Sequence, residues 1–129
     1  MNRYILIEEG TSPRARIDAA ASWLESLGGG TIVSDLKSNL ESTFGTRTAA
    51  EFKRLEESLS RRGVRLAWRR AGLPFHGNVV AAFTTRDVIE TLDEREGIDN
   101  LLVLGWAPMD YEDWAERQAP TRVFIAKAQ

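Results

Sequence analysis

The stretch that decides the fold is residues 27–39, which read LGGGTIVSDLKSN. Upstream of it, Ser12 and Pro13 provide a helix cap and a first helical residue, and apolar residues then recur at helical spacing as far as Leu27. Downstream of the glycines, residues 31–34 form a short apolar run that is typical of a buried strand. The glycines therefore end a helix and precede a strand, which predicts that helices and strands alternate along the chain.

Three glycines close to Ser34, Asp35 and Lys37 also raise the question of a phosphate-binding loop. Such loops follow a strand and open a helix, because the free N–H groups and the dipole at a helix amino terminus face the anion. Here the order is reversed, so the glycines lie at the carboxyl end of the helix dipole, which repels phosphate. Residues 34–37 match S-x-x-K, but the companion motifs of serine–lysine acylating enzymes are absent from the sequence. We therefore interpret the glycines as a helix cap.

Other apolar runs and capping motifs extend the alternation in both directions. We expect further strands at 3–8, 64–68, 78–83, 101–104 and 121–126, and further helices beginning at Thr48, at Thr84 or Thr85, and at Asp110. This order predicts an α/β fold: a three-layer, Rossmann-like open sheet, mostly parallel, with helices on both faces. All 129 residues fit a single domain. No helix is expected between the strands at 64–68 and 78–83, so we expect one antiparallel pair there, with the last strand at an edge.

Composition excludes several kinds of site. The chain has no cysteine, which rules out disulfides, thiolate metal sites and a cysteine nucleophile. Its single histidine does not favour a zinc site, and we expect no metal and no cofactor. The apolar run at residues 4–7 is followed by two glutamates, and no other run approaches the roughly 20 residues of a membrane span. We therefore expect a soluble, cytoplasmic protein without membrane contact.

Charge is unevenly distributed along the chain. Residues 1–86 carry a balance of +4 and residues 87–116 a balance of −9, whereas the whole chain has a net charge of −2. Such segregation can steer an anionic partner to one face, or bring copies together in a homo-oligomer, which the last edge strand would also favour. The other interpretation is that the acidic segment forms a pair of solvated helices, and that the arginines of residues 61–70 pair with it in the same molecule.

Polar side chains gather where the predicted strands end. Ligands of open α/β sheets bind at the carboxyl ends of the strands, and three of these exits open helices whose amino termini favour anions. The candidate ligand-binding residues are Ser12, Arg14, Ser34, Asp35, Lys37, Asn39, Thr84, Arg86 and Asp110. Our leading hypothesis is a small non-catalytic or accessory domain that binds an anionic small molecule or a protein partner in this crevice. For each residue alone, an ordinary helix cap is the competing interpretation.

An enzyme is the first alternative, because paired groups with opposed environments can transfer protons. The acid–base groups of this hypothesis are Asp35 and Lys37, or Glu8 and Glu9, facing His76 or Asp110. His76 falls in a predicted turn between two strands, so a histidine without a catalytic role is the competing interpretation.

Nucleic-acid binding is the second alternative. A basic segment, residues 61–70, contains one tryptophan, Trp68, and the arginines Arg61, Arg62, Arg65, Arg69 and Arg70. Guanidinium groups beside an aromatic ring suit contacts with phosphates and bases. However, strand alternation predicts that Trp68 points away from Arg65 and Arg69 into the core, and an isoelectric point near 5.5 is low for a nucleic-acid-binding domain.

Overall fold

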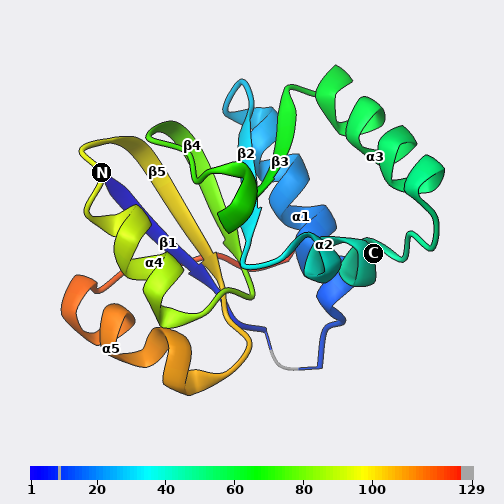
Figure 1. Ribbon diagram of the computed structural model, residues 1–129. Helices are drawn as coiled ribbons and strands as arrows, with labels where there is room; N and C mark the ends of the chain where they lie inside the picture. Colours follow the sequence, from blue (N-terminus) through cyan, green and yellow to red (C-terminus); the bar gives the residue numbers. More distant parts are fainter. Residues whose placement is uncertain (9, 126–129) are drawn as a thin grey trace.

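The computed structural model describes residues 1–8 and 10–125, which form a six-stranded sheet in the order β3-β2-β4-β5-β1-β6 (Figure 1). All five pairs of neighbouring strands are parallel. The strands are β1 (Asn2–Leu6), β2 (Gly30–Ser34), β3 (Val64–Trp68), β4 (His76–Ala82), β5 (Gly97–Leu104) and β6 (Thr121–Arg122). The predicted α/β class is confirmed.

Helices cover both faces of the sheet, which gives three layers (Figure 1). The helices are α1 (Pro13–Ser26), α2 (Lys37–Phe44), α3 (Ala49–Arg61), α4 (Arg86–Asp93) and α5 (Pro108–Gln118), with a short 3₁₀ helix, η1 (Arg69–Ala71). The buried side chains of α1, α2 and α3 belong to one apolar cluster and those of α4 and α5 to the other. No helix in the described part of the chain is long and apolar enough to cross a membrane.

The two apolar clusters are separated by the central strands, whose side chains alternate between them. In β4, Val80 belongs to the cluster of α1, while its neighbours Val79 and Ala81 belong to that of α4 and α5. All three side chains are fully buried. A strand buried on both faces reads as a continuous apolar run, which explains why the sequence predicted this strand and the buried second half of β5.

The expected antiparallel pair between the third and fourth strands is wrong. Strand β2 lies between β3 and β4 and is parallel to both. Residues 69–75, which contain η1, run from the end of β3 to the start of β4 and so return the chain to the amino edge of the sheet. A parallel crossover usually requires a dozen or more residues and a helix, and this unusually short connection is why the sequence pattern indicated a hairpin-like turn.

The sequence also missed α2 and misjudged several strand boundaries: β1 ends at Leu6 and not at residue 8, and β5 begins at Gly97 and not at residue 101. Only Leu40 and Phe44 of α2 are buried, so its apolar pattern is short, and Gly45 ends it with a left-handed φ of 76°. The final strand, β6, pairs with β1 at the edge as expected, but it contains only two residues, and residue 126 lies outside the described residues. His76 begins β4 instead of lying in a turn.

The glycines that follow α1 are a helix cap, as predicted. The N–H of Gly29 donates to the carbonyl of Leu24 at 2.8 Å, and the φ of Gly29 is 113°. A Cβ atom at Gly29 would lie 2.5 Å from the carbonyl oxygen of Gly63, and one at Gly30 would overlap the carbonyl of Asn78. The second and third glycines thus let the start of β2 approach its neighbours closely.

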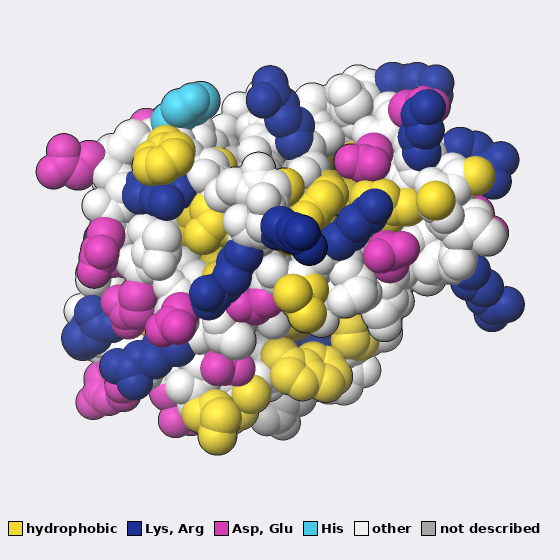
Figure 2. Space-filling model, in the orientation of Figure 1, with side chains coloured by type: hydrophobic (Ala, Val, Ile, Leu, Met, Phe, Trp, Pro, Cys, Tyr) yellow, Lys and Arg dark blue, Asp and Glu magenta, His cyan; other side chains and the backbone are white. Residues whose placement is uncertain are grey.

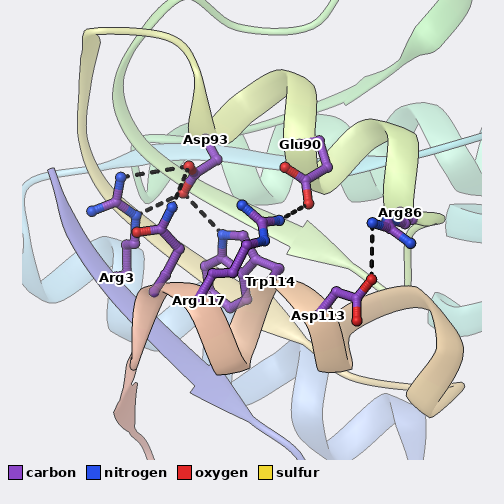
Figure 3. A network of polar contacts seen from close by, with 8 residues as sticks. Arg3, Arg86, Glu90, Asp93, Asp113, Trp114 and Arg117 are labelled. Atoms are coloured by element: carbon purple, nitrogen blue, oxygen red, sulfur yellow. Dashed lines mark hydrogen bonds and ion pairs between the residues drawn. The ribbon is translucent and has the colours of Figure 1, made fainter.

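Part of the acidic segment pairs with arginines of the same molecule, but mostly not with those of residues 61–70: among the described residues of that segment, Arg69 lies 3.9 Å from Asp87. The ion pair between Asp93 and Arg3 joins α4 to β1 (Figure 3). Two further ion pairs join α4 to α5, namely Glu90 with Arg117 and Arg86 with Asp113. Acidic and basic side chains are accordingly interleaved over α4 and α5 on the surface, at the lower left of Figure 2.

Candidate functional site

The connections of neighbouring strands diverge at the carboxyl edge of the sheet. The chain leaves β1 for α1 on one face, whereas it leaves the adjacent β5 for α5 on the other face. The adjacent strands β2 and β4 diverge in the same way, toward α2 and α4. Divergence of this kind opens a crevice between the loops, and it is where open α/β sheets bind ligands.

A cleft of about 450 Å³ lies at this edge, between the amino terminus of α1, helix α2 and the exits of β4 and β5. We call it the α1/α2 cleft. It is lined by Ser12, Pro13, Arg14, Asn39, Ser42, Thr43, Ala82, Phe83 and Trp106. Its volume is within the range of small-molecule sites, and none of these lining residues is acidic. The cleft can therefore accept a ligand with a negative charge.

Arg16 lies against the two aromatic side chains that line the α1/α2 cleft, Phe83 and Trp106, and is only 7% exposed. Its guanidinium carbon is 5.0 Å from the ring centre of Phe83 and 5.9 Å from that of Trp106. Its Nη1 donates to the carbonyl of Gly105 at 2.6 Å, while its Nε finds no hydrogen-bond partner among the described residues. Burial lowers the pKa of Arg16, and Glu8 nearby opposes that effect. An arginine remains charged in proteins, so the site holds a buried cation with an unused donor.

The exit of β4 carries a second unusual feature. Phe83 has a φ of 55°, in the left-handed region that a bulky side chain rarely adopts. The next residue, Thr84, is 3% exposed, and its hydroxyl has no partner among the described residues. Backbone strain and unpaired buried polar groups both concentrate at binding sites.

Three of the nine predicted ligand-binding residues meet in the α1/α2 cleft. Ser12 caps α1 by accepting the N–H of Ala15 at 3.1 Å. Arg14 donates to Asp18 and to the carbonyl of Phe44, so that it holds α1 against the end of α2.

Asn39, the third of these residues, is in the first turn of α2. Its Oδ1 accepts the N–H of Leu36 at 3.0 Å, which caps that helix. Each predicted cleft residue therefore has a structural contact of its own and also lines the cleft.

Asp35 has a structural role that sequence reasoning did not anticipate. Its carboxylate accepts the N–H of Thr85 at 2.8 Å and the hydroxyl of Thr85 at 2.7 Å. Arg69 Nε lies 3.3 Å from the same carboxylate. Asp35 thus fastens the exit of β2 to the start of α4.

The other predicted ligand-binding residues do not line the cleft. The buried hydroxyl of Ser34 contacts the carbonyl of Ala82 at 3.4 Å, and the ammonium of Lys37 lies 4.9 Å from the ring centre of Phe52. Thr84 is buried, as described above. Arg86 and Asp110 stand in the first turns of α4 and α5, and Arg86 pairs with Asp113 at 2.9 Å.

The structure does not assemble the proposed acid–base group of Asp35, Lys37 and His76. Strand β4 runs parallel to β2 and begins at His76, so His76 lies at the amino edge of the sheet, whereas Asp35 follows the carboxyl end of β2. The seven residues of β4 separate the two edges by about 20 Å. Of the other groups in that hypothesis, Glu8 accepts the N–H of Ile125 at 3.1 Å, and Glu9 lies outside the described residues.

The arginines of the basic segment do not form one surface of free charges. Arg62 pairs with Glu25 at 3.1 Å, and Arg69 is held by Asp35. Trp68 is half-buried and packs against Phe52 of α3 at a ring distance of 6.2 Å, on the core side of the strand as its alternation predicted. The remaining arginines of the segment, Arg61, Arg65 and Arg70, are exposed along β3 and at its two ends. Nucleic-acid binding stays a prediction.

Sequence reasoning missed several residues of the site, among them Arg16, Phe83, Trp106 and, on the unpredicted helix α2, Ser42 and Thr43. A signal was present for the first three. Arg16 precedes Ala20 by four positions on the buried side of α1, and a charged residue on an apolar stripe is unusual. Phe83 and Trp106 are aromatic residues just beyond the ends of β4 and β5.

Among the described residues, no three histidine, aspartate or glutamate side chains are grouped closely enough to hold a metal ion. The charged groups next to the α1/α2 cleft are instead the guanidiniums of Arg14 and Arg16. Comparison with protein-family models and with curated proteins finds no match for this chain.

Proposed function

We propose that this chain is a small-molecule-binding domain that holds an anionic ligand in the α1/α2 cleft, at the carboxyl edge of a Rossmann-like sheet. The observation that carries the proposal is the guanidinium of Arg16. It is buried against two rings of the cleft wall, Phe83 and Trp106, and its Nε has no partner among the described residues. Arg16 does not line the cleft itself, so it favours an anion there through its charge, while Arg14 lines the cleft and can contact the anion directly.

The charges at the start of α1 support the same conclusion. The first turn of α1 contains no acidic residue, and Arg14 and Arg16 both lie within its first four residues. The amino terminus of a helix is positive, so cations there are unfavourable and acidic residues are the usual choice. Asp18 offsets part of this charge through its exposed ion pair with Arg14, and Glu8 lies near Arg16. A bound anion would remove the remaining repulsion.

The proposal is tested by calorimetric titration with three probes: phenyl phosphate, benzoate and benzylamine. The two anions should bind, and benzylamine, which carries a positive charge on a similar ring, should not. Arg14→Gln should weaken the binding of phenyl phosphate by about ten-fold, since a hydrogen bond to a charged group contributes ~1.5 kcal/mol or more. Arg16→Met should weaken it further, provided that circular dichroism shows a folded protein.

Arg47→Gln is the matched control, because it removes the same charge from an exposed position that does not line the cleft. It should leave the affinity for phenyl phosphate unchanged. The proposal is wrong if neither anion binds, if benzylamine binds as tightly as benzoate, or if Arg14→Gln and Arg47→Gln have equal effects.

A further inference from the structure

The α1/α2 cleft has an aromatic wall, formed by Phe83 and Trp106. The two rings meet edge to face, with centres 6.0 Å apart and planes at 81°. Trp106 is 65% exposed, so most of its indole surface is open to a ligand. Arg16 behind it adds positive charge to the same wall. Flat aromatic groups of ligands stack on such surfaces, and the stacking does not require a particular pattern of hydrogen bonds.

Another part of the cleft lining is polar and belongs to α2. Asn39, Ser42 and Thr43 are spaced by three and four residues, so they share one face of that helix. All three line the cleft. One amide and two hydroxyls provide both donors and acceptors, which suits a ligand that carries several hydroxyl groups.

The third part of the cleft lining is positively charged. Ser12 and Arg14 line it there, and the amino terminus of α1 adds its dipole. Arg14 is held in place by its contacts with Asp18 and Phe44, so its position is largely set before a ligand arrives. An anionic group of the ligand belongs at this end.

We propose that the ligand has three parts that match these walls: a flat aromatic ring, a hydroxylated middle and a terminal phosphate, as in a nucleoside monophosphate. This inference rests on the proposed function and narrows it. An inorganic anion alone would leave the exposed face of Trp106 uncovered. An apolar carboxylate would make no use of the donors and acceptors on the polar face of α2.

The inference is tested by titrating the protein with inorganic phosphate, ribose 5-phosphate, adenosine and adenosine 5′-monophosphate. The monophosphate should bind at least ten-fold more tightly than ribose 5-phosphate, because stacking of one base contributes about that factor. Trp106→Ala should remove this difference without changing the affinity for ribose 5-phosphate. Phe75→Ala, which removes another exposed ring, should leave the difference intact. Ser42→Ala should weaken both sugar phosphates by a similar factor.

The possible failures are distinguishable. If phenyl phosphate binds at the α1/α2 cleft but adenosine 5′-monophosphate binds no more tightly than ribose 5-phosphate, the ligand class is wrong and the proposed function stands. If Trp106→Ala and Phe75→Ala change the affinity for the monophosphate equally, the aromatic wall has been assigned wrongly. If adenosine binds as tightly as its monophosphate, or if no anion binds, the proposed function fails together with this inference.

Discussion

The indole Nε1 of Trp114 donates a hydrogen bond to Oδ1 of Asp93 at 2.9 Å (Figure 3). The same carboxylate accepts Arg3 Nε at 2.7 Å and Gln118 Nε2 at 3.2 Å, and its side chain is only 8% exposed. One carboxylate thus joins α4, α5 and β1, and its removal would leave a fully buried indole N–H without a partner.

We therefore expect Asp93→Ala to lower the free energy of unfolding by about 3 kcal/mol, as is typical when one partner of a buried charged network is lost. Urea denaturation measures the change. Asp113→Ala is the control, because its ion pair with Arg86 is more than half exposed and should contribute less than about 1 kcal/mol. Equal losses for the two variants would contradict the assigned role of Asp93.

Asp35 should matter for stability and not for binding. Asp35→Ala removes two hydrogen bonds to Thr85, and we expect a loss of about 2 kcal/mol. Its affinity for phenyl phosphate should match that of the unmodified protein. Asp87→Ala is the control, since Asp87 also faces Arg69 but at 3.9 Å and with its side chain 87% exposed. A large loss of ligand affinity in Asp35→Ala would instead place Asp35 in the binding site.

Neighbouring glycines after α1 should respond differently to alanine. Gly28 has a φ of 92° but open space around its Cβ position, so Gly28→Ala should lower the free energy of unfolding by about 1 kcal/mol through backbone strain alone. Gly29→Ala adds a Cβ atom 2.5 Å from the carbonyl oxygen of Gly63 and should lower it by more than twice as much. Thermal unfolding of both variants tests this order, and equal losses would show that the close approach to Gly63 is not a constraint.

Because Phe83 has a left-handed backbone, we expect glycine to be less destabilising than alanine at this position, which is the reverse of the usual order. Both Phe83→Ala and Phe83→Gly lose the ring, but glycine adopts a φ of 55° without strain, so Phe83→Gly should be the more stable by about 1 kcal/mol. At Phe52, within α3, the order should be reversed, because glycine is unfavourable in a helix interior by ~1 kcal/mol relative to alanine. The same order at both positions would contradict the strain at Phe83.

The layered α/β architecture could be predicted because its signals are local. The helix cap at Ser12, the glycines after α1 and the apolar runs of β4 and β5 each indicate an element without knowledge of the rest of the chain. Strand order is not local. The short connection between β3 and β4 is compatible with a hairpin in sequence, and only the position of β2 between them makes the pair parallel.

The candidate site was predicted in position but only partly in its residues. Ser12, Arg14 and Asn39 were identified because they follow strands or open helices, and those relations are visible in the sequence. Asp35 and Lys37 satisfied the same rule, but their side chains turn to Thr85 and to Phe52. Which way a side chain at a strand exit turns depends on neighbours that the fold supplies from elsewhere in the chain.

The place of β1 in the sheet has a consequence for how the chain folds during synthesis. Among the described strands, β1 comes first in the chain, yet its partners there are β5 and β6, and Asn2 lies opposite Asn100. Its apolar side chains therefore stay without a partner strand until most of the chain has left the ribosome. Contacts of such large sequence separation slow folding and leave apolar surface exposed to aggregation in the meantime. The nascent chain should accordingly depend on shielding by a chaperone until β5 emerges.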